Sequence, residues 1–196
     1  MLLLRNDPLI ENIKSDYIRI EKLMLEMKEK KLTGFFEVNL GKFRDILIYN
    51  SGKVVKVLQI NSNFRAINKD KVVLDLVKSE AVFSVYRMKE SYLKALLFSI
   101  ENVPLYKNLS SDFVDIRKLL KKLEKDKFSG VIYVRWNKRS EGIILMDSGS
   151  PKASAYMEEK IVMEGAEALE TIILETERKM ADIDVITDRR EYGRNL

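Results

Sequence analysis

Apolar residues recur along two stretches of the chain at the spacing of one face of an α-helix. The first stretch carries them at Tyr17, Ile20, Met24 and Met27, and the second at Phe113, Ile116, Leu120 and Leu123. Steps of three and four residues predict amphipathic helices, and the charged residues between them predict solvated outer faces. Because the second set follows the first at a constant interval of 96 residues, the chain contains two copies of one unit.

The residues around each predicted helix supply its ends. Ser15 or Asp16 is expected to cap the first helix, and Ser111 or Asp112 the second, because their side-chain oxygens accept hydrogen bonds from the first backbone N–H groups. Each helix is followed by a Ser/Thr-Gly pair, where we expect glycine to make the turn into a strand. These pairs are Thr33-Gly34 and Ser129-Gly130.

Runs of β-branched and aromatic residues follow each of these pairs and predict strands. They cover residues 35–39, 46–49 and 54–60 in the first copy, and 131–135, 143–146 and 152–156 in the second. Asn50-Ser51-Gly52 and Asp147-Ser148-Gly149 predict tight turns before the third strands. By alternation, the side chains expected to face the core are Phe36, Val38, Ile132 and Val134.

The remaining apolar segments complete the fold class. A second helix is expected at residues 161–176, with a shorter counterpart at 71–78, closing strands at 81–86 and 183–186, and a helix at 90–100. We predict an α+β fold of two tandem repeats, each a helix, an antiparallel three- to four-stranded meander and a helix. The expected divisions are a lead segment at 1–16, a first unit with its linking helix at 17–107, a second unit at 108–188 and a basic tail at 189–196.

The chain of 196 residues contains no cysteine and no histidine. This excludes disulfides, thiol nucleophiles, zinc sites of the Cys/His kind and dyads that depend on histidine. There is no run of about 18 apolar residues of the kind that spans a membrane, so a cytoplasmic protein is expected. The heavy use of Lys and Glu without cysteine resembles the composition of thermophile proteins.

The net charge of +5 is concentrated in the first half of the chain. Residues 1–100 contain 18 Lys and Arg against 12 Asp and Glu, whereas residues 101–196 contain 17 against 18. A basic excess favours a nucleic-acid partner, but the basic residues here alternate with acidic ones, which is typical of solvated helix faces. Nucleic-acid binding by the basic first unit is therefore kept as the alternative function.

One group of residues is the candidate partner-binding site. Tyr133, Arg135 and Trp136 combine aromatic rings and a guanidinium on a predicted strand and the loop after it. Such a group would anchor a partner protein or stack on bases, because Trp, Tyr and Arg are enriched at interface hot spots. The other interpretation of Trp136 is that its ring covers the edge of its own core.

Carboxylates near the end of the chain were weighed as a cation site. Asp182 and Asp184 would project from one face of a strand, with Asp188 nearby. Sites made only of oxygen ligands usually need more ligands than this. We therefore predict no metal site, and the sequence predicts no catalytic residue and no cofactor either.

The order of helix, Ser/Thr-Gly, two strands, Asn/Asp-x-Gly turn, third strand, helix and short strand resembles the PATAN domain family of bacterial signalling proteins. The resemblance covers the second copy fully and the first copy less well, since the first lacks an alanine after Gly52 and has a shorter helix. It implies a non-enzymatic module that mediates protein contacts in signalling or motility, and it implies no catalytic residue. The residues that carry it are Leu119, Leu123, Phe128-Ser129-Gly130, Ile144 to Met146, Asp147-Ser148-Gly149, Ala153 or Ala155, and Gly165 to Leu169.

Together these observations predict a non-catalytic protein–protein interaction or regulatory module of a signalling system. A duplicated unit without histidine or cysteine has large surfaces and little chemistry. The expected partner is a protein, with a homodimer among the options, and nucleic acid is the less favoured partner. No membrane partner is expected.

Overall fold

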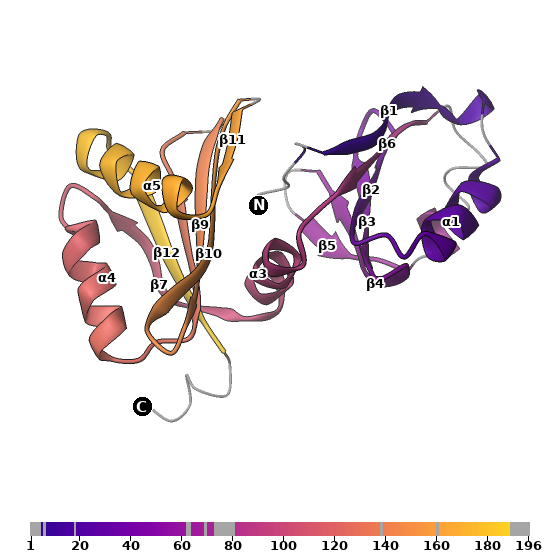
Figure 1. The fold of residues 1–196 in the computed structure, drawn as a ribbon. Coiled ribbons are helices and arrows are strands. Elements are labelled where there is room, and N and C mark those ends of the chain that lie inside the picture. The colour runs from indigo at the N-terminus through magenta and orange to yellow at the C-terminus, as the bar shows by residue number, and fades with distance from the viewer. Residues whose placement is uncertain are drawn as a thin grey trace. The chain divides into compact units, whose positions relative to one another are not determined.

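A computed structural model of the chain describes residues 5, 7–17, 19–61, 64–68, 70–72, 81–137, 139–159 and 161–188 (Figure 1). The chain divides into two compact units, here called the first unit (residues 5–93) and the second unit (from residue 94 onward). Each unit contains one six-stranded antiparallel sheet together with helices. The predicted α+β class and the two repeated units are confirmed.

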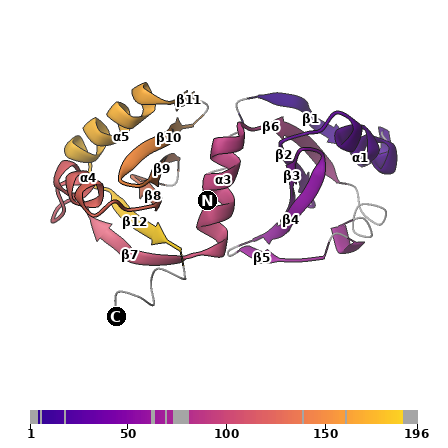
Figure 2. The same cartoon turned by 60° about the horizontal axis from the view of Figure 1, so that its bottom comes forward.

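The first unit places its closing strand in the interior of its sheet. In chain order it consists of β1 (Pro8–Lys14), a 3-10 turn (Ser15–Tyr17), α1 (Ile20–Glu29), β2 (Gly34–Asn39), β3 (Arg44–Asn50), β4 (Lys53–Ile60), β5 (Phe64–Ala66) and β6 (Val82–Arg87). The strand order is β1-β6-β2-β3-β4-β5, so the meander of β2, β3 and β4 is extended on both sides. Figure 2 shows β6 lying between β1 and β2.

The second unit repeats this plan. It contains β7 (Val103–Ser110), α4 (Ile116–Lys125), β8 (Gly130–Arg135), β9 (Ser140–Asp147), β10 (Ser150–Glu158), β11 (Ile161–Glu164), α5 (Ala166–Arg178) and β12 (Asp182–Thr187). The strand order is β11-β10-β9-β8-β12-β7, in which β12 takes the place that β6 has in the first unit. Both α4 and α5 cover one face of this sheet (Figure 1).

A helix, α3 (Glu90–Glu101), spans the division between the units. Its sequence carries apolar residues on most sides, and Tyr92, Leu93, Ala95 and Leu96 are buried. The helix ends at Glu101, and Pro104 lies in edge strand β7, where a missing N–H is tolerated.

The backbone of the two units matches in detail where the first strand meets the helix. The Ser15 N–H donates to the Ala81 carbonyl at 2.8 Å, and the Ser111 N–H donates to the Ala181 carbonyl at 2.9 Å. In return, the two serine hydroxyls accept from the N–H groups of the same alanines at 3.2 and 2.9 Å. These bonds tie the start of each unit to the loop before its closing strand.

The helix ends also match, and they differ from the prediction. Lys31 and Lys127 adopt left-handed conformations, with φ of 51° and 52°, and the N–H of the next residue donates back to Met27 or Leu123 at 2.9 Å. Each is the Schellman ending, in which a left-handed residue closes the helix and is usually glycine. The expectation that the following glycine makes this turn was therefore wrong.

Glycine is needed three residues later, at Gly34 and Gly130, for a different reason. A Cβ atom on Gly34 would lie 2.1 Å from the Tyr86 carbonyl oxygen, and one on Gly130 would lie 2.3 Å from that of Ile186. The two glycines open β2 and β8 where these strands run closest to the closing strands β6 and β12. The predicted tight turns between second and third strands are confirmed by positive φ at both of their glycines.

Each sheet packs a hydrophobic core against its helices. The core of the first unit contains Phe36, Val38, Leu47 and Phe83 beneath Ile20, Leu23 and Met27 of α1. The core of the second contains Ile132, Val134, Ile144 and Val185 beneath residues of α4 and α5. The side chains predicted by alternation to face the core do so in both units.

The cores differ at one equivalent position. In the first unit the buried carboxylate of Asp45 accepts a hydrogen bond from the Gln59 side chain at 2.9 Å. The second unit has Gly142 opposite Tyr156 there, and the Trp136 ring packs edge-on to Tyr156 with 5.4 Å between centroids. In the second unit, aromatic rings therefore occupy the space that polar side chains occupy in the first unit.

Three strands lie in segments that the sequence assigned otherwise, and one of them, β11, occupies the first four residues of the helix predicted at 161–176. β1 lies in the stretch set apart as a lead segment, and β7 crosses the boundary predicted between residues 107 and 108. Both strands contain an asparagine with φ of 54°, Asn12 and Asn108, and irregular pairing around it. These bulges interrupt the two-residue alternation that would have predicted strands.

The helices begin later than predicted. α1 starts at Ile20 and α4 at Ile116, so Tyr17 and Phe113 precede them. The cap of α4 is Asp115, whose carboxylate accepts from the Lys118 N–H at 3.1 Å, and Arg19 caps α1 without a side-chain bond. The predicted serine and aspartate caps were therefore wrong.

Some predicted segments lie partly or wholly outside the described residues. The shorter helix at 71–78 is described only at Lys71 and Val72, which are helical, and the basic tail at 189–196 is not described. Among the described residues, no helix is long and apolar enough to span a membrane.

Candidate functional site

Tyr133 and Arg135, two of the three predicted partner-binding residues, lie together on the sheet face that α4 and α5 leave free. The Arg135 guanidinium lies 5.4 Å from the centroid of the Tyr133 ring and 3.2 Å from the carboxylate of Asp184 on the neighbouring strand. It also donates to the side chain of Asn108 at 3.2 Å, and the Asn108 N–H donates to Asp184 at 2.7 Å. The charges of this cluster are compensated within it.

The Tyr133 hydroxyl has a partner of its own in the same cluster. It donates a hydrogen bond to the carboxylate of Glu141 on β9. Burial, reinforced by the negative charge of Glu141, raises the pKa of Tyr133 well above its ordinary value. The phenol therefore stays protonated as a hydrogen-bond donor, and it does not provide a phenolate for catalysis near neutral pH.

Trp136 lies away from these two residues. Its ring packs against the core beneath α5, close to Tyr156 and to the face of Gly142 that lacks a side chain. Its indole nitrogen is buried and has no hydrogen-bond partner among the described residues. Trp136 thus covers the edge of its own core, and the three predicted residues do not form one continuous surface.

The carboxylates considered as a cation site differ in burial and in their partners. Asp184 is buried and engaged by Arg135 and Asn108, whereas Asp182 is exposed at the start of β12. Within the described ranges, no three acidic side chains are grouped so that they could hold a metal ion. The negative charge of Asp184 compensates the positive charge of Arg135.

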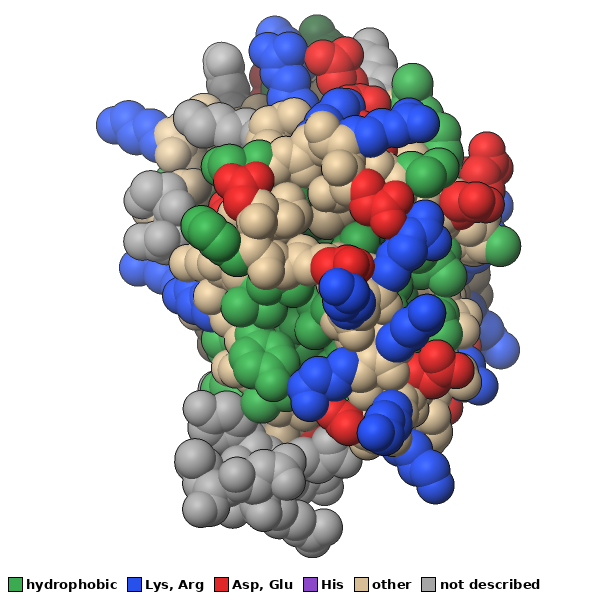
Figure 3. All heavy atoms as spheres, turned by 90° about the vertical axis from the view of Figure 1, so that its left-hand side faces the viewer, with side chains coloured by type: hydrophobic (Ala, Val, Ile, Leu, Met, Phe, Trp, Pro, Cys, Tyr) green, Lys and Arg blue, Asp and Glu red, His purple; other side chains and the backbone are tan. Residues whose placement is uncertain are grey.

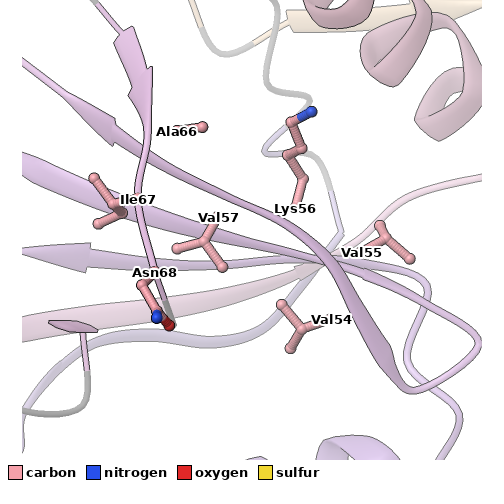
Figure 4. A pocket seen from close by; sticks show the side chains of 7 residues that line it. All are labelled: Val54, Val55, Lys56, Val57, Ala66, Ile67 and Asn68. Carbon is pink, nitrogen blue, oxygen red and sulfur yellow. The ribbon is translucent and has the colours of Figure 1, made fainter. Parts of the chain in front are cut away.

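A shallow hollow lies beside β4 in the first unit. It has a volume of about 370 Å³, and Figure 4 shows the apolar side chains of Val54, Val57 and Ile67 around it. Val55 is an extra residue in the pairing of β3 with β4, and such bulges disfavour the addition of another strand. The equivalent stretch of the second unit begins with Pro151 and Lys152, which are exposed.

The most exposed large apolar side chain among the described residues belongs to Phe113, at 91%. It lies in the turn between β7 and α4, where its N–H donates to the Ser110 carbonyl at 3.1 Å. Ser111 joins this turn to the loop after α5 through its bonds with Ala181, and that loop presents Met180 at 66% exposure. Phe113 and Met180 are together called the Phe113 surface.

The first unit presents an aromatic ring at the equivalent position. Tyr17 precedes Phe113 by 96 residues, lies in the 3-10 turn before α1 and is 78% exposed. Its turn is held by the matching pair of hydrogen bonds between Ser15 and Ala81. The repeat thus keeps a large aromatic side chain at a position where neither unit buries it.

Charged side chains surround the Phe113 surface. The Arg117 guanidinium of α4 and the Glu177 carboxylate of α5 form an ion pair, which raises the pKa of Arg117 and joins the start of α4 to the end of α5. The backbone N–H of Lys118 lowers the pKa of the Asp115 carboxylate, so this cap stays ionised. Figure 3 looks onto the side on which α4 and α5 lie in Figure 1 and shows Lys and Arg side chains through its lower right, with Asp and Glu side chains among them.

Reasoning from the sequence missed the Phe113 surface because the periodic pattern assigned Tyr17 and Phe113 to buried helix faces. One signal could have corrected it. Asp115 and its neighbour Ile116 open the charged helix directly, and the preceding Ser110, Ser111 and Asp112 are turn-forming residues. A turn ending at residue 115 leaves Phe113 outside the helix.

Comparisons with known proteins give one match, which lies in the second unit. Residues 103–191 match the sequence model of a family described as an uncharacterised protein conserved in archaea (DUF2226). This stretch begins at the first residue of β7 and extends beyond β12, so it includes the whole second sheet and the Phe113 surface. No curated protein and no solved structure matches the chain. The resemblance to PATAN domains stays a prediction.

Proposed function

We propose that this protein is a non-catalytic, cytoplasmic protein-interaction module that binds a partner protein through the Phe113 surface. The observation that carries the proposal is the 91% exposure of the Phe113 side chain on a turn held by backbone hydrogen bonds. Burying such a ring fully is favourable by about 1.5–3 kcal/mol. An exposed ring on a fixed turn is the kind of feature that anchors interfaces.

The fixed turn matters because ordering a flexible loop opposes binding. An interface side chain that becomes immobilised costs about 0.5–1.5 kcal/mol, and a preformed turn avoids the additional cost of ordering its backbone. The turn around Phe113 is joined to the loop of Met180 at Ser111 and Ala181, with N···O distances of 2.9 Å. The free energy gained by burying the two apolar side chains is therefore not reduced by the cost of ordering this backbone.

The repeat supports the same conclusion. Tyr17 and Phe113 occupy equivalent turns. Each side chain is exposed, although each unit has a hydrophobic core between its sheet and its helices. The polar residues that could support chemistry are instead paired with one another, as Arg135 is with Asp184 and Tyr133 with Glu141. A role in a signalling or regulatory system is what the PATAN resemblance implies.

Site-specific photo-crosslinking tests the proposal. A photoreactive phenylalanine analogue is placed at Phe113 or, as a control in the same unit, at exposed Lys152 on β10. After irradiation in extract of the source cells, we expect a discrete protein adduct from position 113 and not from position 152. Met180→Asp in the position-113 variant should reduce the adduct, because it places a charge beside the anchoring ring.

The result that would contradict the proposal is the same adduct pattern from both positions, or no protein adduct from position 113. Both sites are exposed, so neither substitution is expected to unfold the protein. The fluorescence of Trp136, which is the only tryptophan, reports whether the second unit remains folded. An adduct with labelled oligonucleotide alone would favour the nucleic-acid alternative.

A further inference from the structure

The two helices beside the Phe113 surface carry opposite charge. α4 contains five basic residues against one acidic residue, Glu124, and α5 contains four glutamates against one basic residue, Arg178. Both helices cover the same face of the second sheet. This face of the second unit therefore has a basic half and an acidic half.

Some of these charged side chains form ion pairs within the unit and others do not. Arg117 pairs with Glu177, and Lys122 pairs with Asp126 at 3.1 Å. Among the residues that the structure describes, exposed Lys121, Lys125 and Glu167 have no ion pair.

We propose that the partner at the Phe113 surface is a second copy of this chain, with α4 of each copy against α5 of the other. This inference rests on the proposed function and names its partner. A two-fold axis running between the helices brings each basic half onto an acidic half, so the favourable charge contacts are made twice. Because α4 begins where α5 ends, the same axis brings Phe113 of one copy beside Met180 of the other.

A nucleic acid fits this face less well. A polyanion requires a continuous positive surface, and the glutamates of α5 would repel phosphates lying along α4. A second copy of the chain instead supplies both signs of charge in the required arrangement. The apolar pair lies at the end where α4 begins and α5 ends, so the same contact buries apolar anchors beside the charge pairs of the two helices.

The size of the two helices sets the expected strength. Helices of 10 and 13 residues are about 15 and 20 Å long, so the interface lies at the small end of specific complexes. We expect a dimer with a dissociation constant on the order of micromolar to tens of micromolar. Because its charge pairs are exposed, raising the salt from about 0.05 to 0.5 M should weaken it by roughly tenfold or more.

Charge-swapped variants of the full chain test the pairing. Sedimentation equilibrium of the wild-type protein should show a species of twice the 22.8 kDa chain mass that dissociates on dilution. Lys121→Glu with Lys125→Glu should be monomeric, and so should Glu167→Lys with Glu170→Lys. Mixing the two variants should restore a dimer, since basic α5 then meets acidic α4. The matched control, Lys107→Glu with Lys152→Glu, changes net charge equally elsewhere on the second unit and should still dimerise.

A monomer at all concentrations up to about 0.5 mM, far above the expected dissociation constant, would overturn the homodimer. So would failure of the mixed variants to associate while each retains its Trp136 fluorescence. A monomer that still crosslinks from position 113 to another protein overturns this inference and leaves the proposed function standing. A protein that neither dimerises nor crosslinks overturns both, and loss of oligonucleotide binding in the Lys121 and Lys125 variant would assign α4 to nucleic acid instead.

Discussion

Gly149→Ala is expected to destabilise the second unit more than Gly165→Ala, although both glycines have positive φ. Gly149 has φ of +83°, and a Cβ atom there would lie 2.5 Å from the backbone oxygen of Glu124 at the end of α4. Gly165 has φ of +74°, and a Cβ atom there would meet nothing within 4 Å. The pair therefore separates backbone strain from steric conflict within one unit.

The magnitudes follow from these two geometries. Gly165 combines positive φ with ψ of −145°, a backbone region that is essentially reserved for glycine, and holding alanine there costs about 1–3 kcal/mol, which is the whole effect expected for Gly165→Ala. The left-handed conformation of Gly149 costs alanine about 1–2 kcal/mol. Gly149→Ala also pushes the hairpin away from α4 and strains the bond from the Gly149 N–H to the Phe128 carbonyl, which is 2.8 Å long. Losing such a bond costs about 1–3 kcal/mol when a group stays buried without a partner, for a total of roughly 2–5 kcal/mol.

Urea unfolding followed by Trp136 fluorescence measures this difference, because the only tryptophan lies in the second unit. In thermal melts of a unit of this size, each kcal/mol corresponds to about 4–8 °C. Equal free energies of unfolding for the two variants would refute the steric argument. The first unit offers an independent repetition followed by circular dichroism, with Gly52→Ala in conflict with the Lys28 oxygen at 2.4 Å and Gly41→Ala free of contacts.

Two further predictions concern single residues. Lys127→Gly should stabilise the second unit by about 1 kcal/mol, since glycine accepts φ of 52° without strain, and Lys125→Gly within α4 should instead cost about 1 kcal/mol in the same urea assay. Burial raises the pKa of Tyr49 to about 12, so the folded state favours the neutral phenol, and stability is lost as the pH rises from the ordinary pKa of 10 towards 12. Tyr49→Phe should reduce that loss without lowering stability near neutral pH, because the hydroxyl is buried without a hydrogen-bond partner among the described residues. Circular dichroism melts at increasing pH measure this, and a variant that is more sensitive to alkali than the wild-type protein would count against the prediction.

The meanders and their turns could be predicted because their signals are local. Alternation over residues 35–39 and 131–135 identified the core side chains, and glycine after Asn-Ser or Asp-Ser identified the hairpins. β1 and β7 could not be predicted in this way, because Asn12 and Asn108 interrupt the alternation and because both strands are defined by pairing with residues 68 or more positions away. The positions of these strands are determined by hydrogen bonds to distant segments and not by a local sequence pattern.

The candidate site was harder to predict for the same reason. The three-residue step from Phe113 to Ile116 fits a helix face, and only the turn closed by Ser110 and the loop at Ala181 shows that the ring points into solvent. Tyr133 and Arg135 were placed on a common strand face from the sequence. Asp184 compensates the charge of Arg135. This pairing could not be predicted from the segment around Arg135, because Asp184 lies 49 residues further along the chain.

The position of the closing strand also has a consequence for biosynthesis. β12 lies between β8 and β7, yet a ribosome makes it after every other strand of its sheet. Until Thr187 has left the exit tunnel, β7 has no neighbour, and the meander presents an open edge along β8. The first unit meets the same delay at β6, so each sheet must gain its interior strand last, and contacts of such long sequence separation form slowly. The growing chain therefore passes twice through a state with an unpaired strand edge, which is where aggregation or chaperone binding during translation would act.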